Sequence, residues 1–244
     1  MKLSDFSVPD LAIKYILFQR TELIRFSNLH IFRAATKVIP GLSYNTRVQI
    51  EARIRSHQIC KEYFKILLDE YHSIQSFLPK ECSNILDIGC GMAGIDIFLD
   101  NHYKNGEVKF YLLDRTHIDS RVYYMYQDRG SFYNSLPVAK QLLESNGISP
   151  QRIALLEASD DLTIPIKQGL DLVVSLISWG YHYPVSTYLD SAYALLRKTG
   201  SLIIDIREGS NGLDTLVSKF GGSNVSVILN SKKFLRVHAV KSGC

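Results

Sequence analysis

Residues 87–94 have the sequence Asp87-Ile-Gly-Cys-Gly-Met-Ala-Gly94. A short, mostly apolar run at 84–86 precedes this stretch, and the largely apolar residues 95–99 follow it. The pattern predicts a strand, a glycine turn and then a helix. Glycines at 89 and 91 allow the backbone to turn sharply and to approach a ligand that a Cβ atom would hold away. Because a helix begins with free N–H groups, the pattern favours a nucleotide-type cofactor.

The composition is that of a folded protein of ordinary domain size. The chain has 244 residues, of which 46% are hydrophobic and 21% are charged, and this balance argues against disorder. Its net charge of +4 is too small to indicate a nucleic-acid partner, so we expect none.

The cysteines and the N-terminus indicate the compartment. The four cysteines lie too far apart in the sequence for a metal knuckle or a redox pair, which favours reduced thiols. Residues 1–9 lack the pattern of a secretory signal. We therefore expect a cytoplasmic protein.

The chain divides near Pro79 into two parts. Residues 1–79 have helical patterns interrupted at Pro40-Gly41, and residues 80–244 alternate between short β-rich runs and helical runs. Such alternation indicates a parallel sheet with crossover helices. Strands are predicted at 84–88, 108–113, 153–157, 170–175 and 201–206, and helices near 93–103, 136–146, 187–197 and 212–219.

The last two strands break this alternation. Residues 225–229 and 234–240 are both β-rich, and only four residues separate them. Because four residues cannot hold a crossover helix, the pair must form an antiparallel hairpin. We therefore expect a seven-stranded, mostly parallel sheet whose terminal strand is reversed.

Two acids define the kind of cofactor. Asp114 ends a predicted strand twenty residues beyond Gly94, where a carboxylate can accept hydrogen bonds from both hydroxyls of a ribose. Asp87 stands directly before the glycines, where it would repel the pyrophosphate of a dinucleotide. The same acid would attract an ammonium or sulfonium group. S-adenosylmethionine carries both cations and no phosphate.

Residues 84–94 resemble motif I of the class I S-adenosylmethionine-dependent methyltransferases, and the terminal hairpin resembles the reversed seventh strand of that family. The resemblance covers 84–240 and leaves the N-terminal helices outside it. It implies a Rossmann-like α/β fold. In the family, residues like Asp87 and the two glycines line the amino-acid half of the cofactor, and an acid like Asp114 holds the ribose. The implied cofactor-binding residues are Asp87, Gly89, Cys90, Gly91, Asp114, Arg115, Ser159, Asp160 and Leu176.

The turn after the third predicted strand would meet the adenine in this family. Alignment through Asp161 puts Ala158 where an Asp is common, so Ser159 or Asp160 would take over that contact.

The resemblance places the methyl acceptor beyond the fourth strand, at 175–184. The Asn/Asp-Pro-Pro-aromatic signature of amino methyltransferases is absent there. Ser175 stands where metal-dependent family members have an Asp, so we expect no metal. His182 is the candidate base for a hydroxyl acceptor, because its ordinary pKa of about 6.5 suits it to accept a proton near pH 7.

Other interpretations of these residues stay open. His182 could be a packed structural histidine, and His117 is a second candidate base. The predicted substrate-binding residues are Trp179, Tyr181, Tyr183, Tyr133 and Arg207. The aromatic stretch at 123–133 is predicted to cover the acceptor.

The function expected from these features is metal-independent O-methylation of a sugar, a glycolipid or another small-molecule hydroxyl. A natural-product hydroxyl is the alternative acceptor, and a non-catalytic scaffold that keeps the fold is the alternative function. The basic and apolar N-terminal helix would contact the inner membrane surface or a partner subunit in a homodimer, or pack on its own domain.

Overall fold

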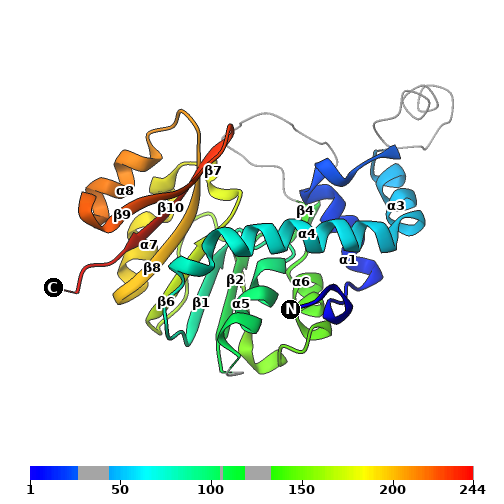
Figure 1. Ribbon diagram of the computed structural model, residues 1–244, viewed down its shortest axis with the longest axis horizontal. Coiled ribbons are helices and arrows are strands. Elements are labelled where there is room, and N and C mark those ends of the chain that lie inside the picture. Colours follow the sequence, from blue (N-terminus) through cyan, green and yellow to red (C-terminus); the bar gives the residue numbers. More distant parts are fainter. Residues whose placement is uncertain (27–43, 105–106, 119–132, 244) are drawn as a thin grey trace.

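A computed structural model describes residues 1–26, 44–104, 107–118 and 133–243. A twisted sheet runs through the molecule with helices on both faces (Figure 1). Its seven strands lie in the order β5-β2-β1-β6-β8-β10-β9. Their bounds are β1 Asn84–Ile88, β2 Lys109–Asp114, β5 Ile153–Glu157, β6 Leu170–Ser175, β8 Leu196–Arg207, β9 Val225–Asn230 and β10 Phe234–Val240.

The pairing of the strands confirms the expected fold. Strand β1 pairs in parallel with β2 and β6, β2 with β5, and β6 with β8. Strand β10 is antiparallel to both β8 and β9. The sheet is therefore Rossmann-like and mostly parallel, with its terminal strand reversed. The carboxyl ends of β1, β2 and β6 meet at one edge, at the point where the strand order changes direction, which is where such sheets bind ligands.

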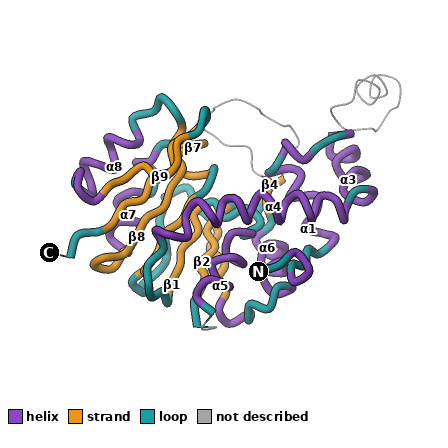
Figure 2. Tube along the Cα trace, in the orientation of Figure 1, coloured by secondary structure: helices purple, strands orange, loops and turns teal. Residues whose placement is uncertain are grey.

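Helices follow the strands as expected (Figure 2). The described helices are α1 Asp10–Gln19, α3 Tyr44–Ile54, α4 Ser56–Ile74, α5 Gly94–Tyr103, α6 Leu136–Ser145, α7 Leu189–Leu195 and α8 Gly212–Phe220. Short 3-10 turns lie at Leu3–Asp5, Thr21–Leu23, Gln75–Phe77, Pro150–Arg152, Val185–Thr187 and Gly222–Asn224.

Successive side chains of the strands pack into two separate hydrophobic cores. On β1, Ile85 joins the core with α4, α5 and α6, and Leu86 joins the core with α7 and α8. On β2, Phe110 and Tyr111 divide in the same way. Successive residues of a strand point to opposite faces, so each face of the sheet is covered by its own layer of helices.

Three details differ from the expected elements. Residues Ser178–Tyr183 form an extra short strand, β7, where a loop was expected. Strand β8 begins at Leu196 and not near 201, because Leu196 pairs with Leu170 on β6 ahead of a register shift. Two further strands, β3 His117–Ile118 and β4 Tyr133–Asn134, pair with each other outside the main sheet.

The N-terminal part packs on the α4/α5/α6 side of the sheet. Helix α1 lies against α3, α4 and α6. Six of its apolar side chains join that core: Ala12, Ile13, Tyr15, Ile16, Leu17 and Phe18. The apolar side of α1 is thus covered by its own domain. No helix in the described part of the chain has the length and apolar character needed to span a bilayer. Pro40-Gly41 and most of the aromatic stretch, residues 123–132, lie outside the described residues.

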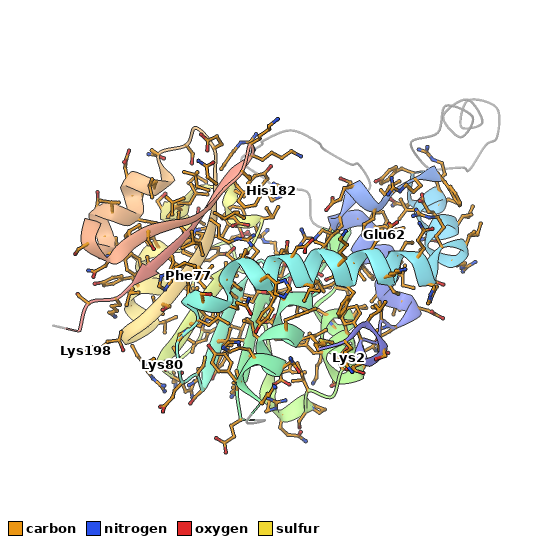
Figure 3. The ribbon with its side chains drawn as sticks, in the orientation of Figure 1. Lys2, Glu62, Phe77, Lys80, His182 and Lys198 are labelled. Atoms are coloured by element: carbon orange, nitrogen blue, oxygen red, sulfur yellow. The ribbon has the colours of Figure 1, made fainter. Side chains whose placement is uncertain are left out.

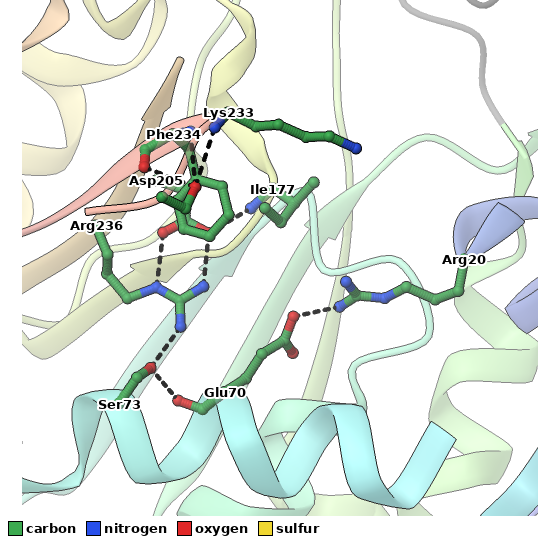
Figure 4. Close-up of polar contacts among 9 residues, drawn as sticks. Arg20, Glu70, Ser73, Ile177, Asp205, Lys233, Phe234 and Arg236 are labelled. Atoms are coloured by element: carbon green, nitrogen blue, oxygen red, sulfur yellow. Dashed lines mark hydrogen bonds and ion pairs between the residues drawn. The ribbon is translucent and has the colours of Figure 1, made fainter. Parts of the chain in front are cut away.

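A buried ion pair ties the reversed strand to the rest of the sheet. Arg236 on β10 donates through Nε and Nη2 to the two carboxylate oxygens of Asp205 on β8, each at 2.7 Å. The third guanidinium nitrogen, Nη1, donates to Ser73 Oγ on α4 at 2.6 Å. The N–H of Ile177, in the loop after β6, donates to Asp205 at 3.1 Å. The pair thus joins two strands, a helix and a loop at the ligand-binding edge (Figure 4).

Loss of Arg236 should destabilise the fold strongly. Arg236→Met leaves the fully buried Asp205 carboxylate without its cation, and such a loss costs about 3–5 kcal/mol. Lys219→Met is the control, because it breaks the exposed pair of Lys219 with Asp190, which contributes about 1 kcal/mol or less. Urea unfolding of both variants measures the two losses. Equal losses would contradict a structural role of the buried pair.

Candidate functional site

The glycine loop folds against the end of β2. The N–H groups of Gly89 and Cys90 donate to the oxygen of Leu113 at 2.7 and 3.3 Å. The N–H of Gly91 donates to Asp114 Oδ2 at 2.8 Å. Gly89 and Gly91 have φ of +70° and +55°, in the region that favours glycine. The predicted strand, turn and helix are present, and the loop reaches the acid that was predicted to hold a ribose.

Side chains of the protein itself cover all three glycines of the motif. A Cβ atom at Gly91 would lie 2.6 Å from Gln19 Oε1, one at Gly94 would overlap the hydroxyl of Tyr63, and one at Gly89 would overlap that of Ser178. Gln19 ends α1 and Tyr63 lies on α4. The N-terminal part therefore builds one wall of the site. The sequence motif gave no signal of this, because these residues are far from it in the chain.

Gln19 connects the loop to β4. It accepts a hydrogen bond from the N–H of Met92 at 3.1 Å and donates to Asn134 Oδ1 at 3.3 Å. With Asp114 bound to Gly91, the four N–H groups from Gly89 to Met92 all have acceptors within the protein. An incoming phosphate would therefore have to displace these acceptors before the loop could bind it.

Three carboxyl groups beside the loop carry poorly compensated charge. Burial raises the pKa of Asp87 well above its usual range, and the neighbouring Asp96 carboxylate raises it further. Burial raises the pKa of Asp96 to about 7, although the side chain of Asp87 beside it opposes the shift. Burial raises the pKa of Asp114 to about 6, although hydrogen bonds from Gly91 and Arg115 oppose the shift. A cation would be favoured at this position and an anion disfavoured.

The predicted adenine-side residues meet at the ends of β2 and β5. Arg115 forms an ion pair with the exposed Asp160, and the N–H of Ala158 donates to the oxygen of Asp114 at 2.9 Å. The hydroxyl of Ser159 donates to Asp161 at 2.5 Å. The structure thus brings Asp114, Arg115 and Asp160 together, while Ser159 is engaged within its own turn.

Hydrogen bonds from buried side chains stabilise the turn after β6. Ser175 is buried and donates to the oxygen of Ile88 at 2.7 Å, and it accepts from the N–H of Trp179 at 3.0 Å. Trp179 is fully buried, and its indole N–H donates to the oxygen of Val185 at 2.9 Å. Its ring therefore packs in the core, and the prediction that Trp179 binds the substrate is wrong. Leu176 is half-buried and packs on the other core.

Neighbouring residues of β7 face different surroundings. The Tyr183 hydroxyl lies 3.5 Å from the position of a Cβ on Gly89, beside Ser178. Burial raises the pKa of Tyr183 above its usual range. His182 is exposed, and its ring lies 5.0 Å from that of Tyr181. The Arg207 guanidinium lies 5.7 Å from the Tyr181 ring.

His182 lies on β7, at the ligand-binding end of the sheet (Figure 3). Partial desolvation of its ring, followed by the nearby Arg207 cation, lowers the pKa of His182. His182, Tyr181 and Arg207 thus form one cluster, and Tyr183 belongs to the glycine-loop side. The backbone of His117 on β3 pairs with that of Asn134 on β4, and the backbone of Tyr133 pairs with that of Ile118. The side chains of His117 and Tyr133 lie outside the described residues. In the described part of the chain, no three potential metal ligands gather.

The structure is similar to several solved methyltransferases. The apo S-adenosylmethionine-dependent methyltransferase SibL is 15% identical, with a TM-score of 0.51 over 95% of this chain and 69% of that one. A methyltransferase from Pyrococcus furiosus is 14% identical, with a TM-score of 0.49 over 72% and 83% of the two chains. The T. thermophilus 16S rRNA N2 G1207 methyltransferase, in complex with AdoMet and guanosine, is 14% identical, with a TM-score of 0.49 over 72% and 42%.

No protein-family model matches the sequence, and neither does any curated protein sequence. The similarity to SibL, together with the strand order, shows that the chain has the fold of the class I S-adenosylmethionine-dependent methyltransferases. At this identity the similarity concerns the fold alone.

Replacing Asp96 should stabilise the protein at alkaline pH. The folded-state pKa of Asp96 lies above the ordinary 3.8, so its contribution to stability is lost as the pH rises from that value through about 7. Asp96→Asn removes the buried charge and should raise the free energy of unfolding at pH 8 by up to about 4 kcal/mol. Urea unfolding at pH 5 and pH 8 measures the effect. Asp214→Asn, at an exposed position of α8, is the control, and a destabilised Asp96→Asn protein at pH 8 would contradict the argument.

Proposed function

We propose that this protein is an S-adenosylmethionine-dependent methyltransferase. One observation carries the proposal: the N–H groups of the glycine loop already have acceptors, and buried carboxyl groups surround the loop. A dinucleotide needs free N–H groups for its pyrophosphate, and the acids would repel it. S-adenosylmethionine has a sulfonium and an ammonium group and no phosphate. The site therefore favours the second cofactor.

The residues present fit this cofactor. Asp114 would accept hydrogen bonds from the ribose hydroxyls, because each of its oxygens keeps a lone pair beyond the bonds from Gly91 and Arg115. The ion pair of Arg115 with Asp160 would lie on the adenine side, and Asp87 on the amino-acid side. When bound, the cofactor would supply a methyl group on a cationic sulfur. The chain has then to position the acceptor and remove its proton.

The residues of β7 favour a hydroxyl group as the methyl acceptor. His182, with its lowered pKa, is neutral near pH 7 and able to accept a proton. Tyr183, with its raised pKa, stays protonated and serves as a hydrogen-bond donor. Ser175 is engaged with backbone groups where a metal-dependent enzyme has a carboxylate, so the proposed reaction is metal-independent.

A sugar or glycolipid is the acceptor that we favour. The rings of Tyr181 and Phe234 lie 6.4 Å apart beside His182, and such rings stack on the apolar faces of sugars. A natural-product hydroxyl would suit the same rings. Measuring the formation of S-adenosylhomocysteine with a panel of hydroxyl compounds identifies the acceptor.

Variants of Asp114 and His182 separate binding from catalysis. Asp114→Ala removes buried hydrogen bonds and should weaken S-adenosylmethionine binding by roughly 5- to 150-fold. His182→Ala should leave this affinity unchanged and lower turnover by roughly 100-fold or more. Calorimetry measures the first effect and the acceptor assay measures the second.

Asp190→Asn, an exposed acid distant from the loop in sequence, is the control for both measurements. Normal turnover in His182→Ala would remove His182 as the base. If the unaltered protein binds neither S-adenosylmethionine nor S-adenosylhomocysteine, the proposed function is wrong. A scaffold function would then take its place.

A further inference from the structure

A second ion pair lies where the N-terminal part meets the site. Arg20 follows the last residue of α1 and donates through Nη2 to Glu70 Oε1 on α4 at 2.8 Å. The two side chains are only 19% and 12% exposed. The other carboxylate oxygen, Glu70 Oε2, is buried and has no hydrogen-bond partner among the described residues. Figure 4 shows the side chains of Arg20 and Glu70 pointing toward each other.

This pair lies close to the glycine loop. Gln19, directly before Arg20, binds the N–H of Met92. Burial raises the pKa of Asp87, and Glu70 is among the carboxylates that raise it further. Burial likewise raises the pKa of Tyr63, whose hydroxyl covers Gly94, and the nearby Arg20 cation opposes that shift. Arg20 and Glu70 thus lie near Asp87, the acid that directly precedes the glycine loop.

The pair is a poor stabiliser by itself. Burying two charges costs dehydration free energy, and their attraction repays that cost only when the remaining polar atoms are also satisfied. The bond between Arg20 and Glu70 is a single contact, and one buried oxygen stays unmatched. By contrast, Arg236 satisfies both oxygens of Asp205. An arrangement of this kind is better explained by a ligand that supplies the missing partners.

A cation beside an anion matches the two charges of an amino acid. We propose that Arg20 binds the α-carboxylate, and Glu70 the α-ammonium, of the amino-acid half of the cofactor. The inference rests on the proposed function and extends it to residues outside the motif. It makes the N-terminal part, which contributes both side chains, a determinant of cofactor affinity.

The test compares two ligands that differ only in this half. S-adenosylhomocysteine has the α-carboxylate and α-ammonium, and 5′-methylthioadenosine keeps the adenosine and thioether but lacks both charges. Arg20→Met should lower the affinity for S-adenosylhomocysteine roughly 10- to 100-fold and leave that for 5′-methylthioadenosine unchanged. Arg20→Lys should recover part of the loss, and Glu70→Gln should show the same selectivity between ligands. Calorimetry measures each affinity.

Arg25→Met is the matched control, because Arg25 belongs to the same segment and is 61% exposed. It should change neither affinity. Thermal unfolding identifies any variant that fails to fold. If Arg20→Met does not fold, the two ligands are compared in Arg20→Lys and Glu70→Gln instead.

The outcomes separate this inference from the proposed function. If Arg20→Met weakens both ligands equally, or neither, the pair is structural and the inference is wrong, while the proposed function stands. If the unaltered protein binds neither ligand, the proposed function fails and the inference fails with it.

Discussion

The hydrogen bond from the Gly91 N–H to Asp114 is the contact on which the site depends. It forms because β1 and β2 are parallel neighbours, so that the glycine loop after β1 meets the acid at the end of β2. The bond turns the loop inward and uses a donor that a phosphate would need. It also fixes the carboxylate that would receive the ribose. One contact thus determines both the shape of the loop and the chemistry that it accepts.

The buried acids around the loop carry a cost in stability that a ligand can offset. Asp87, Asp96 and Asp114 all have raised pKa values because burial disfavours their charged forms. A cation bound nearby would favour those charged forms and lower their pKa values. Such a site is destabilised without its ligand and stabilised by it, which is common where binding has been favoured over stability.

The sequence was sufficient for the fold because the fold depends on local patterns. Alternation of strands and helices, the short turn at 230–233 and the glycines before Gly94 each specify their own element. The acid at 114 followed from its spacing to the loop. These signals lie within a few residues of the features that they predict.

The rest of the site depends on contacts between distant residues. Gln19 reaches Met92, and Arg20 reaches Glu70, only because α1 and α4 pack on the same side of the sheet. No local pattern encodes such pairs. Trp179 shows the same limit, because an aromatic residue in a loop-like stretch has the same sequence signature whether its ring faces a ligand or the core.

The central claim is that the glycine loop holds a sulfonium cofactor and not a dinucleotide. Parallel calorimetric titrations of the unaltered protein with S-adenosylmethionine and with NAD⁺ test it most directly. The occupied loop donors and the buried acids predict binding of S-adenosylmethionine and none of NAD⁺. Binding of NAD⁺ without S-adenosylmethionine would contradict the account.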